Sequence, residues 1–186
     1  MTEIAVRPLP GAATDTQPGN YFISNYPPFS FWATEGIEDA RRAFAEPAPG
    51  DTPLGLYVHI PFCRKRCHFC YFKVYTDKNS SAIQRYIDAL IAEAHRYSEQ
   101  AFVRGRSLDY VYFGGGTPSF LSTDQLTRLI GGLKAAFSWD RVQEVAFECE
   151  PGTLSESKVH ALRDLGVTRL SLGVESFDDR VLATNG

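Results

Sequence analysis

Three of the four cysteines in this chain, Cys63, Cys67 and Cys70, lie on one short stretch with the spacing C-x3-C-x2-C. Cysteine thiolates are soft ligands that suit iron–sulfur clusters, zinc and copper(I). Three thiolates on one loop can hold three irons of a [4Fe–4S] cube and leave the fourth iron open to a substrate or a cofactor. A cluster that is closed by four cysteines mainly transfers electrons, so this spacing favours chemistry at an open iron.

A structural zinc site is the main alternative. Structural zinc takes four ligands, commonly as two close pairs that are set apart along the chain. The loop offers its three cysteines and also His68 or His59, whereas Cys149 lies 79 positions beyond Cys70 and has no cysteine or histidine beside it. The short spacings and the lack of a secretory signal argue against disulfides. The pattern therefore favours an iron–sulfur cluster and leaves zinc open.

The residues around the cysteines place them at the end of a strand. Residues 56–60 are predicted to form a short apolar strand, which Pro61 and Phe62 end. Ligands bind at this end of the strands in parallel α/β folds. The basic run at 64–66 either lowers the thiol pKa values, which favours the ligating thiolates, or is a solvated loop. The aromatic residues nearby either exclude water from a cluster or belong to the core.

A glycine run follows the next predicted strand. The residues 110–113 are apolar, and after them come Gly114, Gly115, Gly116 and Thr117. Glycine accepts positive φ angles and lets backbone N–H groups approach a ligand closely, which favours a binding loop over a plain turn. The run matches neither GxxxxGK(S/T) nor GxGxxG, so it does not indicate a nucleoside triphosphate site or a dinucleotide site.

Two carboxylates end later predicted strands. Glu148 follows the apolar run 145–147, and Glu175 follows the run 170–174. A carboxylate at this end of a strand either accepts hydrogen bonds from a ribose or an ammonium group or is an exposed charge at the rim. Cys149 alternates with Glu148 and is predicted to be a small buried residue.

Four ordered motifs between residues 57 and 178 resemble a known family. They are Tyr57-Val-His-Ile-Pro-Phe-Cys, Tyr112-Phe-Gly-Gly-Gly-Thr-Pro-Ser, Glu148-Cys-Glu-Pro-Gly-Thr and Leu170-Ser-Leu-Gly-Val-Glu-Ser-Phe. Together they resemble the radical S-adenosylmethionine (SAM) superfamily. The likeness is strongest to its branch of oxygen-independent coproporphyrinogen III oxidases and heme chaperones (HemN/HemW-like).

The resemblance implies a [4Fe–4S] cluster and SAM as cofactors. The open iron would chelate the amino and carboxylate groups of SAM, and one electron would cleave SAM to methionine and a 5′-deoxyadenosyl radical that abstracts a hydrogen atom. By the same resemblance the cluster ligands are Cys63, Cys67 and Cys70, and no other residue is given a catalytic role. The SAM-binding residues that it implies are Tyr57, Tyr71, Gly114, Gly115, Gly116, Thr117, Glu148 and Glu175, the last standing where the oxidase usually has glutamine.

One position departs from the oxidase pattern. The oxidase has a further cysteine two positions after the last cluster ligand, and this chain has Phe72 there. Chaperone-like relatives typically have phenylalanine at this position, so the departure favours a heme chaperone or another HemN-like role. The resemblance implies a tetrapyrrole, coproporphyrinogen III or heme, as the substrate or ligand, and a flavodoxin- or ferredoxin-type electron donor.

From residue 54 the pattern alternates strands and helices. Strands are predicted at 56–60, 109–113, 144–149 and 168–174. Capping boxes predict helices that begin at Ser81 and run to about Val103, begin at Ser122, and begin at Thr153 and stop at Gly166. Repeated βα units imply a parallel α/β sheet. The resemblance implies a partial, TIM-like (β/α) barrel with six strands in the family, of which about four βα units are expected here.

The chain is expected to divide into three parts. Residues 1–20 lack apolar periodicity and are predicted to be disordered. Residues 21–53 form an aromatic extension with a short helix at 35–45 and a proline-rich linker; its aromatic part either packs on the barrel or covers the site. Residues 54–186 would form the radical SAM core domain, which is expected to be incomplete at its C-terminus.

The composition and charge argue against a nucleic-acid-binding protein and against a membrane protein. The 186 residues carry a net charge of −3 from 19 basic and 22 acidic side chains, so there is no basic footprint for nucleic acid. No stretch approaches the ~20 apolar residues of a membrane span, and the N-terminus does not resemble a secretory signal. A cytoplasmic location is expected, which also suits reduced thiols.

Overall fold

The computed structural model describes residues 32–70 and 72–185, and the chain divides into two units between Ala45 and Glu46. The described part of the first unit holds one helix, α1 (Gly36–Ala45), where the sequence predicted a helix over 35–45. No residue of α1 is buried, and its surface carries ion pairs between residues three positions apart. The predicted disordered segment 1–20 and most of the aromatic segment lie outside the described residues.

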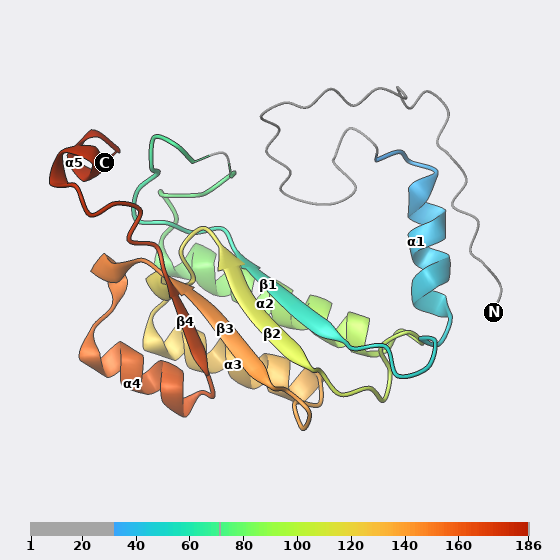
Figure 1. Ribbon diagram of the computed structural model, residues 1–186. Coiled ribbons are helices and arrows are strands. Elements are labelled where there is room, and N and C mark those ends of the chain that lie inside the picture. Colours follow the sequence, from blue (N-terminus) through green and yellow to red (C-terminus); the bar gives the residue numbers. More distant parts are fainter. Residues whose placement is uncertain (1–31, 71, 186) are drawn as a thin grey trace. The chain divides into compact units, whose positions relative to one another are not determined.

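A four-stranded parallel sheet in the order β1-β2-β3-β4 is the centre of the second unit (Figure 1). The strands are β1 (Gly55–Ile60), β2 (Tyr110–Gly115), β3 (Glu144–Cys149) and β4 (Arg169–Leu172). Strands that follow one another in sequence are also neighbours in the sheet, and a helix returns the chain between each pair. The predicted parallel α/β fold is confirmed, although β2 extends two residues further, through Gly115, and β4 is shorter than expected.

Three helices lie on one face of this sheet (Figure 1). They are α2 (Ser80–Ser98), α3 (Thr123–Ala136) and α4 (Glu156–Asp164). Short 3-10 turns follow β2 and β3, namely η2 (Pro118–Phe120) and η3 (Pro151–Thr153), and α5 (Asp179–Asn185) follows β4.

The helix starts show how local hydrogen bonds decide between competing caps. The capping box at α3 is confirmed, because Ser122 and Gln125 bond reciprocally. The prediction for α2 was wrong: Asn79 caps this helix by accepting from the backbone N–H of Ala82, so the helix begins before the predicted Ser81 cap. Asparagine and serine are about equally favourable as N-caps, and in this helix Asn79, which comes first in the chain, is the cap.

The end of α2 and the start of α4 also differ from the prediction. Helix α2 stops at Ser98, five residues before the expected end near Val103. Helix α4 is capped by Ser155 instead of Thr153, because the chain up to Thr153 forms the turn η3. Gly166 ends this helical segment as predicted, with a φ of 98° that favours glycine.

Successive side chains along each strand point to opposite faces of the sheet, and one of these faces is apolar and covered by the helices. Val58, Val111, Phe113 and Phe147 point to the helices and are at most 2% exposed. They pack against apolar helix residues that include Ile87, Leu126, Leu129, Ile130, Leu133 and Leu162. This layer is the hydrophobic core, and it fixes the register of the strands because a slip by one residue would turn the apolar side chains away from the helices.

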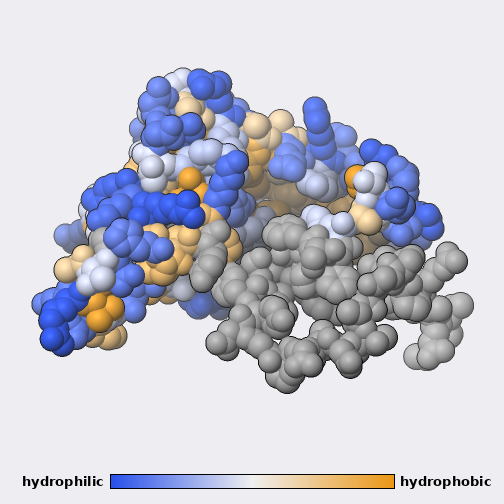
Figure 2. Space-filling model, turned by 90° about the horizontal axis from the view of Figure 1, so that it is seen from above, coloured by the Kyte–Doolittle hydropathy of each residue, from blue (hydrophilic) through white to orange (hydrophobic). Residues whose placement is uncertain are grey.

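The opposite face carries polar and aromatic side chains, which we call the polar face: Tyr57, His59, Tyr110, Tyr112, Glu144, Glu148, Arg169 and Ser171. Tyr57 lies opposite Tyr112 in the register, and Glu148 lies opposite Ser171. The molecular surface is largely hydrophilic in the view of Figure 2, with apolar patches between the polar side chains. Among the described residues no helix is long and apolar enough to span a bilayer.

Two adjacent glycines in α3 test the packing of α3 on α2. A Cβ on Gly132 would lie 2.6 Å from the side chain of Ile91, whereas a Cβ on Gly131 would meet nothing within 4 Å. We expect Gly132→Ala to lower the free energy of unfolding by about 1–3 kcal/mol through overpacking. Gly131→Ala should raise the free energy of unfolding by about 0.5–1 kcal/mol through helix propensity. Urea unfolding of both variants measures this, and shifts of the same sign would contradict the packing.

Candidate functional site

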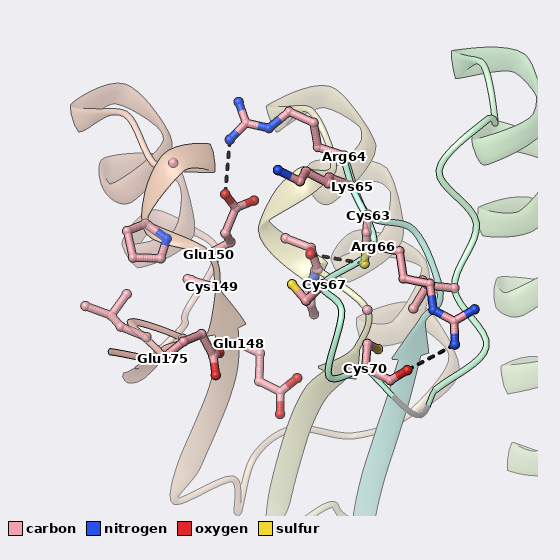
Figure 3. A pocket seen from close by; sticks show the side chains of 18 of the residues that line it. Cys63, Arg64, Lys65, Arg66, Cys67, Cys70, Glu148, Cys149, Glu150 and Glu175 are labelled. Carbon is pink, nitrogen blue, oxygen red and sulfur yellow. Dashed lines mark hydrogen bonds and ion pairs between the residues drawn. The ribbon is translucent and has the colours of Figure 1, made fainter. Parts of the chain in front are cut away.

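One cavity of about 760 Å³ gathers the three clustered cysteines with the ends of three strands (Figure 3). Parallel strands end at the same edge of a sheet, so the loops that follow β1, β2, β3 and β4 meet there. The residues predicted as ligands or binding groups that line this cavity are Cys63, Cys67, Cys70, Gly115, Gly116, Thr117, Glu148 and Glu175. The fold thus brings together groups that lie up to 112 positions apart, from Cys63 to Glu175.

Cys63 is the most firmly placed of the three cysteines. Its backbone N–H donates to the carbonyl of Tyr75 at 3.1 Å, and the N–H of Tyr75 donates to the carbonyl of Pro61 at 2.8 Å. The Cys63 thiol is buried and accepts a hydrogen bond from the Thr117 hydroxyl, with an Oγ1–Sγ distance of 3.3 Å. Burial raises the pKa of the Cys63 thiol, and the bond from Thr117 opposes this rise.

The other two cysteines lie on a turn that contacts α5. The N–H of Cys70 donates to the carbonyl of Cys67 at 3.1 Å, and Arg66 donates to the carbonyl of Cys70 at 3.0 Å. His68, between them, bonds through its backbone N–H to Asn185 and through its ring to the Thr184 carbonyl. The chain therefore holds both half-buried thiols on the cavity wall mainly through backbone contacts, and the Cys70 thiol also donates to the carbonyl of Phe72 at 3.8 Å.

The glycine run is shaped by the chain's own side chains. A Cβ on Gly114 would lie 2.7 Å from the Tyr112 ring and 3.1 Å from both Tyr57 and Glu148. A Cβ on Gly115 would lie 2.7 Å from the ring of His59, and φ is 114° at this position. These two glycines are required because other side chains cover their Cα atoms.

Gly116 makes room for a thiol. A Cβ on this residue would lie 2.8 Å from the Sγ of Cys63 and 2.9 Å from the carbonyl oxygen of Phe62. No residue with a side chain fits there without displacing Cys63 or the strand end. The third glycine therefore sets the position of a sulfur atom directly.

The backbone N–H groups of this run bind within the chain, which corrects the prediction that they approach a ligand. Gly115 donates to Glu148 at 3.1 Å, Gly116 donates to Ile60 at 2.8 Å, and Thr117 donates to Phe62 at 2.8 Å. Any hydrogen bond from these three peptides to a ligand must therefore come through carbonyl oxygens. Carbonyl oxygens accept, so this edge suits a donor such as an ammonium group and not an anion.

The Glu148 carboxylate is hydrogen-bonded within the chain and is not an exposed charge at the rim. Its carboxylate accepts from the Tyr112 hydroxyl through one oxygen and from the N–H of Gly115 through the other. It lines the cavity and is half-buried. Cys149, the next residue, is 4% exposed, as the alternation predicted.

Glu175 enters the cavity from the chain after β4. Its φ is 65°, a left-handed conformation that is uncommon for a residue with a side chain. Such backbone strain is found most often at functional sites, because the surrounding structure must hold it. A Cβ on Gly173 would lie 2.8 Å from the Glu175 carboxylate, so this glycine leaves room for the acidic side chain.

Among the described residues that were predicted to bind SAM, Tyr57 and Gly114 do not line the cavity. Tyr57 stacks on Tyr112 with ring centroids 6.0 Å apart, and its hydroxyl bonds to His59 at 3.0 Å, but it does not line the cavity. Burial and the nearby charge of Glu148 raise the pKa of the Tyr57 phenol. Tyr71 lies outside the described residues.

The basic run between the first two cysteines has a definite partner across the cavity. Arg64 pairs with Glu150 at 3.0 Å, and this ion pair joins the cysteine loop to the end of β3 (Figure 3). A Cβ on Gly152 would lie 2.6 Å from the Arg64 guanidinium, so that glycine makes room for the pair. No local sequence pattern predicts this contact, because the two charged residues lie 86 positions apart.

Within the part of the chain that the structure describes, no three His, Cys, Asp or Glu side chains form a group that could hold a metal ion. The two histidines that were weighed as zinc ligands do not line the cavity. His59 bonds to Tyr57, and His68 bonds to the chain near α5. The three thiols share one cavity but are not arranged around a single ion.

The fold and the cavity define a parallel α/β protein with a thiol-lined site at the carboxyl edge of its sheet. A family model described as the radical SAM superfamily matches residues 57–186. This match covers more than half of the chain, so the chain belongs to the radical SAM superfamily.

Two groups of relatives carry different names. The chain is 36% identical over 132 residues to the oxygen-independent coproporphyrinogen III oxidase of Escherichia coli K12, covering 70% of this chain and 28% of that protein. It is 32% identical over 134 residues to the heme chaperone HemW of the same organism, covering 72% and 35%. The chain thus spans about a third of the length of these relatives.

A solved structure shows the same fold. It is described as coproporphyrinogen III oxidase (HemN) from Escherichia coli, a radical SAM enzyme, and it superimposes with a TM-score of 0.66 at 30% identity. The comparison covers 82% of this chain and 33% of the other. The predicted family and fold class are therefore confirmed, with partial coverage of the domain.

Gly116 provides a test of how the thiol is placed. We expect Gly116→Ala to displace Cys63 and to reduce the iron and acid-labile sulfide bound per chain after anaerobic reconstitution by about half or more, because the new Cβ would overlap sulfur and backbone. Gly55→Ala is the matched control, since its Cβ would meet only a carbonyl at 3.9 Å. Iron retention equal to the control, with intact circular dichroism, would contradict this placement.

Proposed function

We propose that this protein binds a [4Fe–4S] cluster through Cys63, Cys67 and Cys70 and binds SAM beside it, and that it acts in porphyrin or heme metabolism. The single observation that supports the proposal is the shared cavity, in which Cys63, Cys67 and Cys70 lie with the glycine run and with the carboxylates of Glu148 and Glu175. A volume of about 760 Å³ is within the range of ligand pockets. When bound, the two cofactors supply a carbon radical, made by reductive cleavage of SAM, that abstracts a hydrogen atom.

The chain's own residues fit this cofactor pair in charge as well as in size. SAM carries a positive sulfonium and an amino group, whose N–H groups still donate when its nitrogen binds iron. Glu148 and Glu175 line the cavity and offer negative charge to these groups, and the peptides from Gly115 to Thr117 can offer only acceptors to a ligand. Complementary charge of this kind gives orientation and selectivity. Gly114 contributes by leaving room for Glu148, and Tyr57 by packing on the ring beside it.

The substrate that we propose is a tetrapyrrole, because the relatives are named for coproporphyrinogen III and for heme. As an oxidoreductase the protein would act on coproporphyrinogen III in the manner of a dehydrogenase. The electron would come from a flavodoxin- or ferredoxin-type donor. We place the reaction in the cytoplasm, since ligating thiols must remain reduced.

A cysteine comparison tests the cluster assignment. In anaerobically reconstituted protein, Cys67→Ala should lose the SAM-dependent change in the electron paramagnetic resonance (EPR) spectrum of the reduced [4Fe–4S] cluster, since one of three ligands is missing. Cys149→Ala is the matched control: this thiol is buried, and burial raises its pKa to about 11, so it is a poor ligand. A normal SAM-perturbed spectrum in Cys67→Ala would exclude the assignment.

A heme chaperone is the second candidate, and Phe72 favours it. This residue replaces the further cysteine of the oxidase pattern, lines the cavity and is 43% exposed. An exposed aromatic ring at a cavity can stack on the flat face of a porphyrin. The replacement removes a thiol and adds an apolar contact at the same position.

Heme titration separates the two candidates. If the protein is a chaperone, Phe72→Ala should weaken heme binding by about 2- to 10-fold, the range expected for one aromatic stacking contact. Phe177→Ala is the control, because Phe177 is 96% exposed and lies outside the cavity wall. Absence of heme binding together with deoxyadenosine formation on coproporphyrinogen would eliminate the chaperone reading.

A further inference from the structure

We propose that Tyr112 is a positioning residue, whose phenol holds the Glu148 carboxylate in the orientation that accepts hydrogen bonds from the amino group of SAM and faces its positive charge. The inference rests on the function proposed above, because it concerns how that same site binds its cofactor. Tyr112 does not line the cavity, so it acts through Glu148.

Both carboxylate oxygens of Glu148 accept hydrogen bonds from β2. The Tyr112 hydroxyl donates to Oε1, and the backbone N–H of Gly115 donates to Oε2 at 3.1 Å. Two donors that approach from neighbouring strand β2 fix both the position and the rotation of the carboxylate. An ionised carboxylate has about four lone-pair sites. Two of them are used, so Glu148 keeps acceptor capacity for a ligand.

Tyr112 is itself held firmly on the polar face. Its ring stacks on the Tyr57 ring, with centroids 6.0 Å apart and 26° between the ring planes, and the centroid of the Tyr110 ring lies 6.2 Å away. Gly114 leaves the space that both the Tyr112 ring and the Glu148 carboxylate occupy, since a Cβ there would lie 2.7 Å from the ring. Removal of the hydroxyl alone should therefore leave the ring in place.

The phenol remains a donor over the whole working pH range. The hydrogen bond to Glu148, with smaller contributions from burial, raises the pKa of Tyr112 to about 12. A preorganised carboxylate binds a cation without first reorienting, which is the advantage that a supporting residue gives to a site. Without the phenol, Glu148 would keep only the bond from Gly115 and could rotate.

The test measures SAM affinity in the reconstituted holoprotein. Tyr112→Phe should weaken SAM binding by about tenfold, the scale of one hydrogen bond to a charged group. Tyr110→Phe is the matched control: it lies on the same strand and face, but its hydroxyl accepts from Arg169 and does not contact Glu148. Both variants should keep the iron content of the unmodified protein, and the control should keep its affinity.

A double-mutant cycle distinguishes positioning from general structural support. In a Glu148→Gln background, Tyr112→Phe should have no further effect on SAM affinity, because the group that it positions has lost its charge. Additive losses, or a loss equal to that of Tyr110→Phe, would overturn the proposal. If Glu148→Gln alone leaves SAM affinity unchanged, the proposed role of Glu148 fails as well. If Glu148→Gln weakens binding and Tyr112→Phe does not, only the positioning role fails.

A fluorine label covers the case in which Tyr112→Phe folds poorly. 3-Fluorotyrosine at position 112 keeps the ring and the hydroxyl, and its fluorine resonance reports the hydrogen bond beside it. The resonance should shift when SAM is added and should stay fixed in the Glu148→Gln background. A resonance that does not move with SAM in the otherwise unmodified protein would overturn the proposal.

Discussion

Parallel pairing of the four strands is the constraint on which the site depends. Register pairs join β1 to β2, β2 to β3 and β3 to β4, all in the same direction, so four chain segments leave the sheet at one edge. The core on the other face holds this register, since Val58, Phe113 and Phe147 must all point to the helices. The apolar layer therefore determines which polar residues meet at the cavity, although it contributes no ligand.

Three glycines leave the room that side chains of the site occupy. Gly116 admits the Cys63 sulfur, Gly114 admits a tyrosine ring and a carboxylate, and Gly152 admits the Arg64–Glu150 pair. The ion pair is exposed and contributes little to stability, but it joins the cysteine loop to β3. The glycine motif thus acts mainly on the geometry of its own chain, and through it on whatever the cavity binds.

The sequence predicted the βα order, the strand at 144–149, the capping box at Ser122 and the burial of Cys149, because each follows from local spacing and alternation. It did not predict the caps at Asn79 and Ser155, where a neighbouring side chain competes with the expected one. The use of the glycine N–H groups and the Arg64–Glu150 pair depend on contacts between distant segments, which local patterns do not contain. The hydrogen bond from Tyr112 to Glu148 could have been predicted from the sequence, because both residues lie on the same face of neighbouring strands.

The cluster with one iron open to SAM that we propose rests on the three thiols of the cysteine loop, on Glu148 and Glu175, and on Gly116, which leaves room for the Cys63 sulfur. Electron–nuclear double resonance on the reduced holoprotein, with SAM that carries 15N in its amino group, observes that iron directly. We expect a hyperfine coupling from the 15N nucleus to the cluster, because no described side chain other than the three cysteines is proposed as a ligand. An intact cluster signal without any 15N coupling, at a SAM concentration that saturates binding, would contradict the open iron.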